Sequence, residues 1–160
     1  MKTQRAKESV WDYPRPPRVE LLARHVRIVL GGETIAESDR ALRVLETASP
    51  PTIYIPAEDV RTDLLIDAED VHTWCEWKGT ASYVHAKAGA KHANRVAWHY
   101  PEPQEGFEQL AGHFAFYPRR VDAAYLDDEE VTPQPGAYYG GWITAEIEGP
   151  FKGDPGSEGW

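Results

Sequence analysis

One short stretch of the chain combines residue types that can do chemistry with residue types that can shape a pocket. Cys75 and Lys78 each stand next to a tryptophan, and Gly79 follows the lysine. A lysine that aromatic rings partly desolvate has a lowered pKa and can act as a nucleophile, or it can serve as a fixed point charge for an anion. A lysine that only blunts the edge of a strand is the alternative, and the residues alone leave both open.

Other kinds of chemistry fit this stretch less well. Lys78-Gly79-Thr80 resembles the end of a phosphate-binding loop, but the upstream glycine is missing and the surrounding residues predict a strand. Cys75 is the only cysteine of the chain, which excludes an internal disulfide and a cysteine-based zinc site. A lone cysteine is more often a small buried apolar residue than a nucleophile.

The remaining side chains that can hold a metal do not form a recognisable pattern. The six histidines include no close His-x-x-x-His pair. The acidic run from Asp127 to Glu130 lacks the glycine turn and the alternating oxygen ligands of a calcium loop. We therefore expect no metal ion, and no cofactor is predicted.

Several charged and aromatic residues are candidates for the walls of a pocket around Lys78. Arg40 and Glu46 can share one face of a strand or a short helix, although a salt-bridged surface is the alternative. Arg15 stands between prolines in an extended strap, where it either lines the pocket or only helps the strap to pack. Aromatic residues at strand ends complete the walls. The predicted ligand-binding residues are Arg15, Arg40, Glu46, Tyr54, Lys78, Tyr83, Trp98 and Tyr100.

Length and charge limit the classes of protein to consider. A chain of 160 residues suits one domain with a buried core. The formal net charge of −9 argues against binding nucleic acid through its phosphates, which requires a basic face. No apolar run reaches the ~20 residues of a membrane helix, and the N-terminus lacks the apolar core of a signal peptide. We expect a soluble, cytoplasmic protein with no nucleic-acid or membrane partner.

The elements that must position these residues are short strands. Thirteen glycines and thirteen prolines divide the chain into short pieces, which favours strands and turns over long helices. Alternation around Gly31-Gly32 predicts a hairpin over residues 26–37. Residues 41–47 fit a helix as well as a strand, and residues 57–60 predict one helical turn. Further strands are expected at 52–55, 95–100, 112–117, 121–126 and 141–147, with two pieces inside 71–84 that break near Lys78 and Gly79, and a hairpin loop at 86–94.

These elements, about seven to nine strands with frequent turns, predict a mainly β protein with two antiparallel sheets. Residues 1–9 are polar and are expected to be frayed. Residues 10–131 are expected to form a single β domain, and the Gly/Pro-rich residues 132–160 to form a C-terminal extension that wraps this domain.

Several motifs in a fixed order resemble one bacterial family of domains of unknown function, family 427, which has also been labelled nucleotidyltransferase-domain 9. They include Ser9-Val10-Trp11-Asp12-Tyr13-Pro14-Arg15-Pro16-Pro17, Pro50-Pro51-Thr52-Ile53-Tyr54-Ile55-Pro56, Trp77-Lys78-Gly79-Thr80-Ala81-Ser82-Tyr83 and Ala97-Trp98-His99-Tyr100-Pro101-Glu102-Pro103. The resemblance covers about residues 9–131, and the C-terminal residues resemble the extension of actinobacterial members.

The resemblance implies a β-tent, in which two antiparallel sheets with one or two short helical turns meet like a tent and enclose a pocket. The chain lacks the glycine-rich phosphate loop and the paired-aspartate strand that a nucleotidyltransferase would need. The resemblance thus implies a fold and no established reaction.

Three functions remain as hypotheses. The leading one is a domain that binds a small molecule in an aromatic and basic pocket around Lys78. The second is an enzyme that acts on a small anionic metabolite, with Lys78 or, less favoured, Cys75 as the reactive group. The third is an interaction module that forms a homodimer through exposed tryptophans and the C-terminal tail. No catalytic residue is assigned.

Overall fold

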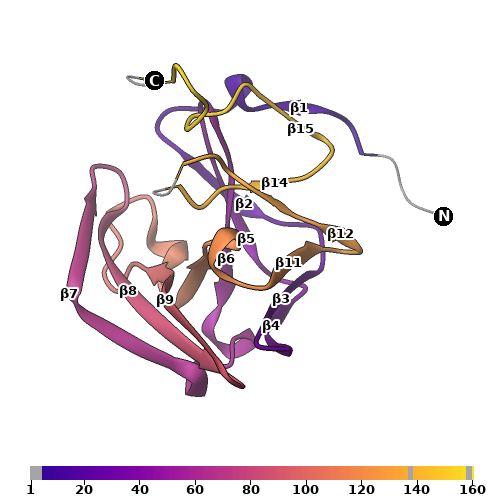
Figure 1. The fold of residues 1–160 in the computed structure, drawn as a ribbon. Helices are drawn as coiled ribbons and strands as arrows, with labels where there is room; N and C mark the ends of the chain where they lie inside the picture. The colour runs from indigo at the N-terminus through magenta and orange to yellow at the C-terminus, as the bar shows by residue number, and fades with distance from the viewer. Residues whose placement is uncertain (1–4, 137–138, 158–159) are drawn as a thin grey trace.

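The computed structural model describes residues 5–136, 139–157 and 160, and Figure 1 shows a mainly β chain whose strands are joined by turns and loops. Five 3₁₀ turns are the only helical elements among these residues. The strands are β1 (Glu8–Ser9), β2 (Arg18–Leu21), β3 (Val26–Leu30), β4 (Glu33–Ser38), β5 (Leu42–Glu46), β6 (Ser49–Pro56), β7 (Leu65–Cys75), β8 (Gly79–Ala88), β9 (Lys91–His99), β10 (His113–Phe116), β11 (Ala123–Leu126), β12 (Glu129–Glu130), β13 (Thr132–Pro133), β14 (Trp142–Ile143) and β15 (Ile147–Glu148). The 3₁₀ turns are η1 (Val10–Asp12), η2 (Ala57–Asp59), η3 (Thr62–Leu64), η4 (Glu108–Leu110) and η5 (Pro118–Arg120).

Two antiparallel sheets contain most of these strands, which confirms the predicted fold class. The larger sheet has seven strands in the order β2-β5-β6-β10-β9-β8-β7, and the smaller has four in the order β12-β11-β3-β4. In Figure 1, β7 and β8 lie at one side of the molecule and β3, β4, β11 and β12 at the other, with β5 and β6 between them. Two minor sheets pair β13 with β14 and, in parallel, β1 with β15.

The predicted hairpin around Gly31-Gly32 is confirmed by the pairing of β3 with β4. Both glycines have a positive φ, 61° at Gly31 and 78° at Gly32, which an L side chain rarely adopts. A Cβ on Gly31 would lie 2.0 Å from the carbonyl oxygen of Ala88, at the end of β8. The tight turn therefore also brings the small sheet against the large one.

Residues 41–47 and 86–94, for which the sequence pattern left the structure open or predicted a loop, form mainly strands. The ambiguous residues 41–47 contain β5, because β2 and β6 pair with it on both sides. The hairpin predicted at 86–94 is present, but its loop is limited to Gly89 and Ala90, since β8 runs to Ala88 and β9 starts at Lys91. Ala86 and Ala93 pair there and are buried. Alanines are too small to produce a visible apolar alternation, and for that reason the sequence pattern resembles a loop.

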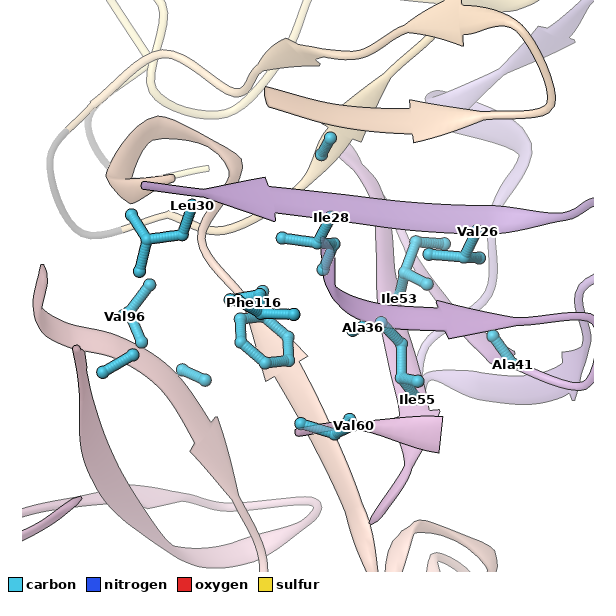
Figure 2. Close-up of a cluster of buried hydrophobic side chains, with 14 of the residues drawn as sticks. Val26, Ile28, Leu30, Ala36, Ala41, Ile53, Ile55, Val60, Val96 and Phe116 are labelled. Atoms are coloured by element: carbon cyan, nitrogen blue, oxygen red, sulfur yellow. The ribbon is translucent and has the colours of Figure 1, made fainter. Parts of the chain in front are cut away.

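The main core lies between the two large sheets. Figure 2 shows Val26, Ile28 and Leu30 of β3 directed toward side chains of the large sheet, among them Ile53, Ile55, Val96 and Phe116. Successive side chains of a strand point to opposite faces. Tyr54, between Ile53 and Ile55, therefore faces away from the small sheet, and it belongs to a second buried cluster. The large sheet thus buries apolar side chains on both faces.

The two ends of the described chain pack on the body and on each other. Glu8–Ser9 pairs with Ile147–Glu148, so the fraying expected for residues 1–9 does not extend to β1, while residues 1–4 lie outside the described residues. Trp142 is 1% exposed and belongs to the main core. The single strand predicted at 141–147 is wrong, because a turn closed by the hydrogen bond from Ile147 N to Thr144 O separates β14 from β15. Among the described residues no helix is long and apolar enough to cross a bilayer.

Candidate functional site

Lys78 stands in the turn that joins β7 to β8, where the sequence predicted a break. Gly79 has φ 107°, so the glycine starts β8 from a turn conformation instead of forming a bulge inside a strand. The turn does not project into solvent. Lys78 is only 8% exposed, and its carbonyl accepts a hydrogen bond of 3.0 Å from the backbone N–H of Gln104. The segment 101–112, which links β9 to β10, therefore packs directly against the lysine turn.

The aromatic residues near this turn come from one row across the large sheet. Register pairs Tyr54 of β6 with Ala115 of β10, Ala115 with Trp98 of β9, and Trp98 with Tyr83 of β8. Directly paired residues have their side chains on the same face of a sheet. Because Ala115 is small, the indole N–H of Trp98 reaches over it and donates a hydrogen bond of 3.2 Å to the hydroxyl of Tyr54.

Further aromatic rings surround this row. The ring of Tyr117 lies 4.6 Å from that of Trp98, and the ring of Tyr100 lies 6.4 Å from that of Tyr54. Phe107 and Leu110, both from the segment 101–112, are buried in the same cluster. We call this group the aromatic–lysine cluster, and it consists of Tyr54, Lys78, Tyr83, Trp98, Tyr100, Phe107, Leu110 and Tyr117.

The cluster lies on the face of the large sheet that points away from the small sheet. The main core occupies the other face, with Ile53 and Ile55 in β6. The aromatic–lysine cluster is therefore enclosed by the large sheet and the segment 101–112. It does not lie between the seven-stranded and the four-stranded sheet, as the resemblance to a tent suggested.

The charge on Lys78 is set by two opposing influences. Burial is the largest and lowers the pKa of the ammonium, but the Tyr54, Cys75 and Glu46 groups around it raise the pKa and outweigh it. The resulting pKa lies above the ordinary value for lysine, so Lys78 is a cation at neutral pH. This direction is opposite to the one that a neutral nucleophilic lysine requires.

No carboxylate of the described residues lies within 4.0 Å of the Lys78 ammonium. Glu46, half-buried near the end of β5, acts on it only from a greater distance. Burial raises the pKa of the Tyr54 hydroxyl, although the Lys78 cation opposes this, so Tyr54 stays neutral. A buried cation without a paired anion is unusual, because burial of an unpaired charge costs free energy.

The two other tyrosines expected in the site behave differently. Burial raises the pKa of Tyr100 far above its ordinary range, and Tyr100 is 5% exposed. Tyr83 is half-buried, and its hydroxyl lies 2.9 Å from the Oγ1 of Thr73 on the neighbouring strand β7. The Tyr100 hydroxyl is therefore a neutral buried group, and the Tyr83 hydroxyl is hydrogen-bonded to β7.

The structure brings together six of the eight residues predicted for the site, namely Glu46, Tyr54, Lys78, Tyr83, Trp98 and Tyr100. Arg40 is instead engaged at the surface, where its guanidinium lies 2.9 Å from Glu58 and 3.0 Å from Asp59. This is the salt-bridged alternative. Arg15 is exposed and is 3.5 Å from the carbonyl oxygen of Thr47.

Sequence reasoning missed Phe107, Leu110 and Gly140. A Cβ on Gly140 would lie 2.4 Å from the ring of Trp98, so this glycine packs directly on the indole. Nothing in the sequence around Gly140 signals a contact with a residue more than forty positions away. Phe107 lies in a segment predicted to contain a helical turn, and η4 at Glu108–Leu110 is that turn.

The described residues contain no group of three or more His, Cys, Asp or Glu side chains that could hold a metal ion. What the cluster offers is a buried ammonium, a half-buried thiol at Cys75, and neutral tyrosine hydroxyls among aromatic rings. Such a combination can bind an anionic group and stack a ring beside it.

Comparison with known families gives one result of note. The family described as a domain of unknown function, DUF427, also named NTP_transf_9, matches residues 18–127. The matched residues span β2 to β11 and include the whole aromatic–lysine cluster. A comparison with curated proteins gave no match.

Proposed function

We propose that this chain, which belongs to the DUF427 family, binds a small molecule that carries an acidic group, and that Lys78 pairs with that group. The single observation that carries the proposal is the buried ammonium of Lys78 with no carboxylate of the described residues within 4.0 Å. An anionic ligand group would supply the missing partner. The surrounding rings would then hold the apolar part of the ligand.

The segment 101–112 would have to move aside to admit a ligand. Phe107 and Leu110 cover the cluster, and the segment is joined to the lysine turn by the hydrogen bond between Gln104 and Lys78. Residues 101–106 form no strand or helix. A segment outside the sheets opens at lower cost than a strand that is paired on both sides, which makes 101–112 the natural lid.

A thermal-shift screen against small carboxylic and phosphorylated metabolites tests this proposal. We expect at least one acid to raise the melting temperature of the wild-type protein, by about 5–10 °C at a hundredfold excess over its Kd. Lys78→Met keeps the length of the side chain and removes the charge, so the same acid should give no shift. Lys87→Met, at an exposed lysine of β8, the strand that follows the lysine turn, is the matched control and should respond like wild type.

Two outcomes would contradict the proposal. One is an acid that stabilises Lys78→Met as much as wild type. The other is stabilisation by neutral compounds only, which would remove the role of the ammonium. The variant must be folded for the comparison, and a cooperative melting transition in the absence of ligand establishes that.

The enzyme hypothesis has weaker support. Lys78 with a raised pKa is a poor nucleophile at neutral pH, since the protonated amine has no free electron pair. Cys75 is half-buried and acts on the Lys78 ammonium, so it is the other nucleophile near the cluster. Turnover of a small anionic metabolite that disappears in Cys75→Ser would favour the enzyme hypothesis over acid binding alone.

The interaction hypothesis draws on exposed apolar side chains. Trp74, at the end of β7, is 67% exposed, and Ile66 on the same strand is 50% exposed. Trp160, however, packs within the chain against Trp11, with ring centroids 4.9 Å apart. A melting temperature that rises with protein concentration and loses this dependence in Trp74→Ser would favour a homodimer through β7.

A further inference from the structure

A second region of the molecule, away from the aromatic–lysine cluster, contains a cavity of about 370 Å³. It lies where the edge strand β2 and the following residues 22–24 meet the C-terminal segment around β14 and β15. Its apolar lining includes Leu22, Ile53, Trp142 and Ile147, all of which are less than 8% exposed. This volume is at the lower end of the range of about 300–1,000 Å³ for small-molecule sites.

The charged residues of the lining balance one another. Three arginines, Arg5, Arg24 and Arg43, face three glutamates, Glu8, Glu20 and Glu146. Each arginine is already ion-paired. Arg5 is 2.7 Å from Asp127, Arg24 is 2.9 Å from Glu146, and Arg43 is 3.1 Å from Glu8. Among the described residues that line the cavity, no cation is free to bind an acidic ligand, in contrast to Lys78.

One polar group of the lining is only partly satisfied. Oε1 of Glu146 accepts a hydrogen bond of 2.9 Å from Arg24, whereas Oε2 has no partner among the residues that the structure describes. The Glu146 side chain is 14% exposed. The hydroxyl of Thr144, a residue that is 5% exposed, likewise makes no hydrogen bond within the described chain. No buried side-chain N or O atom of the described residues lacks a hydrogen-bond partner, so both atoms are open to solvent in the cavity, and a polar group of a ligand can take the place of that water.

From these observations we infer that the cavity binds a small uncharged molecule with an apolar ring and one N–H or O–H donor. The ring would lie against Leu21, which lines the cavity and is 64% exposed, and the donor would bond to the free oxygen of Glu146. An acid would meet the carboxylates of the lining without a free cation to compensate. The site is thus separate from the proposed acid site in location and in the charge of its ligand.

Indole is a suitable probe, because it is a neutral ring with one N–H donor. The experiment is a titration of the whole chain with indole, followed by the methyl resonances of Leu22, Ile53 and Ile147. We expect saturable shifts at these methyls and none at Leu42 and Val44, which lie in the other cluster. 1-Methylindole lacks the donor and should bind about fivefold more weakly, as expected for the loss of one hydrogen bond.

Two variants, each with an exposed alanine replaced by tryptophan, form a matched pair for this test. Ala23 is an exposed residue of the lining, so Ala23→Trp places a ring at the mouth of the cavity without disturbing the core. Ala145 is equally classed as exposed and does not line the cavity, which makes Ala145→Trp the control. We expect Ala23→Trp to weaken indole binding at least tenfold, by roughly 1.4 kcal/mol or more, and Ala145→Trp to leave it within about twofold.

Three results would overturn the inference. The first is an absence of saturable shifts at the three methyl-bearing residues in the wild-type titration. The second is equal affinity for indole and 1-methylindole, and the third is undiminished binding to Ala23→Trp. The wild-type titration needs no variant, so the inference is tested even if a variant fails to fold. Loss of the acid response in Lys78→Met has no bearing on it, and the two proposals fail independently.

Discussion

The indole N–H of Trp98 donates a hydrogen bond of 3.2 Å to the hydroxyl of Tyr54, although the two residues lie on strands that do not pair with each other. Strand β10 runs between them, and its residue in the shared row is Ala115, which is fully buried. A small side chain at this one position lets two large rings meet above it. The aromatic–lysine cluster depends on this gap in the row.

Ala115→Leu should therefore separate Tyr54 from Trp98. The added carbon atoms have no free space, and overpacking of a buried site costs about 1–3 kcal/mol of unfolding free energy. Urea denaturation measures this loss. Ala111→Leu, at an exposed position of the neighbouring segment, is the control and should change the unfolding free energy by less than about 0.5 kcal/mol. An unchanged stability of Ala115→Leu would contradict the proposed packing of the row.

Gly140→Ala tests the contact between the C-terminal segment and the cluster. The new methyl group would lie 2.4 Å from the Trp98 ring, so the indole or the chain at residue 140 must shift. We expect a loss of about 1–3 kcal/mol of unfolding free energy.

The second variant of this test is Trp98→Phe, which removes the ring atoms that the new methyl group would meet. In this background Gly140→Ala should cost much less, so that a double-mutant cycle gives a coupling of about 0.5–3 kcal/mol. Additive effects of the two substitutions would show that they do not touch.

Lys78→Met tests whether the unpaired cation costs stability in the absence of a ligand. Methionine has a similar length without the charge. Because the groups around Lys78 raise its pKa, the folded state favours the ammonium, and we expect the variant to have a lower unfolding free energy than the wild type in urea denaturation at neutral pH. A variant more stable than wild type would show that burial of the charge outweighs these groups, and it would contradict the raised pKa.

Asp127 binds Arg5 and Arg24 and makes the unfolding free energy depend on pH. Burial raises its pKa, but the hydrogen bond from Arg24, the backbone N–H of His25 and the nearby Arg5 lower it by more, so that the net shift is downward. A carboxyl whose pKa is lowered by folding stabilises the folded state above its unfolded pKa. That stabilisation is lost as the pH falls through the folded pKa.

The unfolding free energy should therefore decrease between about pH 5 and pH 2. Asp127→Asn should be less stable than wild type at neutral pH, and the difference should shrink across this window. Asp128→Asn is the control. Asp128 is the exposed neighbour of Asp127 and forms no salt bridge within the described residues. A difference between Asp127→Asn and wild type that stays constant with pH would contradict the role of the charge.

The sequence predicted much of the fold because turns and alternation are local signals. Gly31-Gly32 marks the β3–β4 hairpin, and Pro56 marks the end of β6, as expected. Local signals fail where the buried residues are small, as in the alanines of β8 and β9. They also fail where one turn interrupts an apolar run, as between β14 and β15.

Only part of the candidate site could be predicted from local sequence signals. Lys78 and its aromatic neighbours could be singled out from their types, but the row that joins Tyr54 to Trp98 follows from the register of three strands. Arg40 has a spacing that suits a pocket wall, yet its partners Glu58 and Asp59 are brought to it by the turn η2 after β6. Whether such a side chain lines a pocket or forms an ion pair is decided by tertiary contacts, which a local sequence pattern does not contain.

The proposed acid site depends most on the charge of Lys78. The direct measurement is a pH titration of the ε-carbon resonance of Lys78 in ¹³C-labelled protein. We predict that Lys78 loses its proton at a pH above the ordinary pKa of a lysine, and that an acid found in the thermal-shift screen moves its resonance at neutral pH. Deprotonation of Lys78 below the ordinary lysine pKa would contradict the proposed acid site, because a neutral amine cannot pair with an acid and would instead mark a nucleophile.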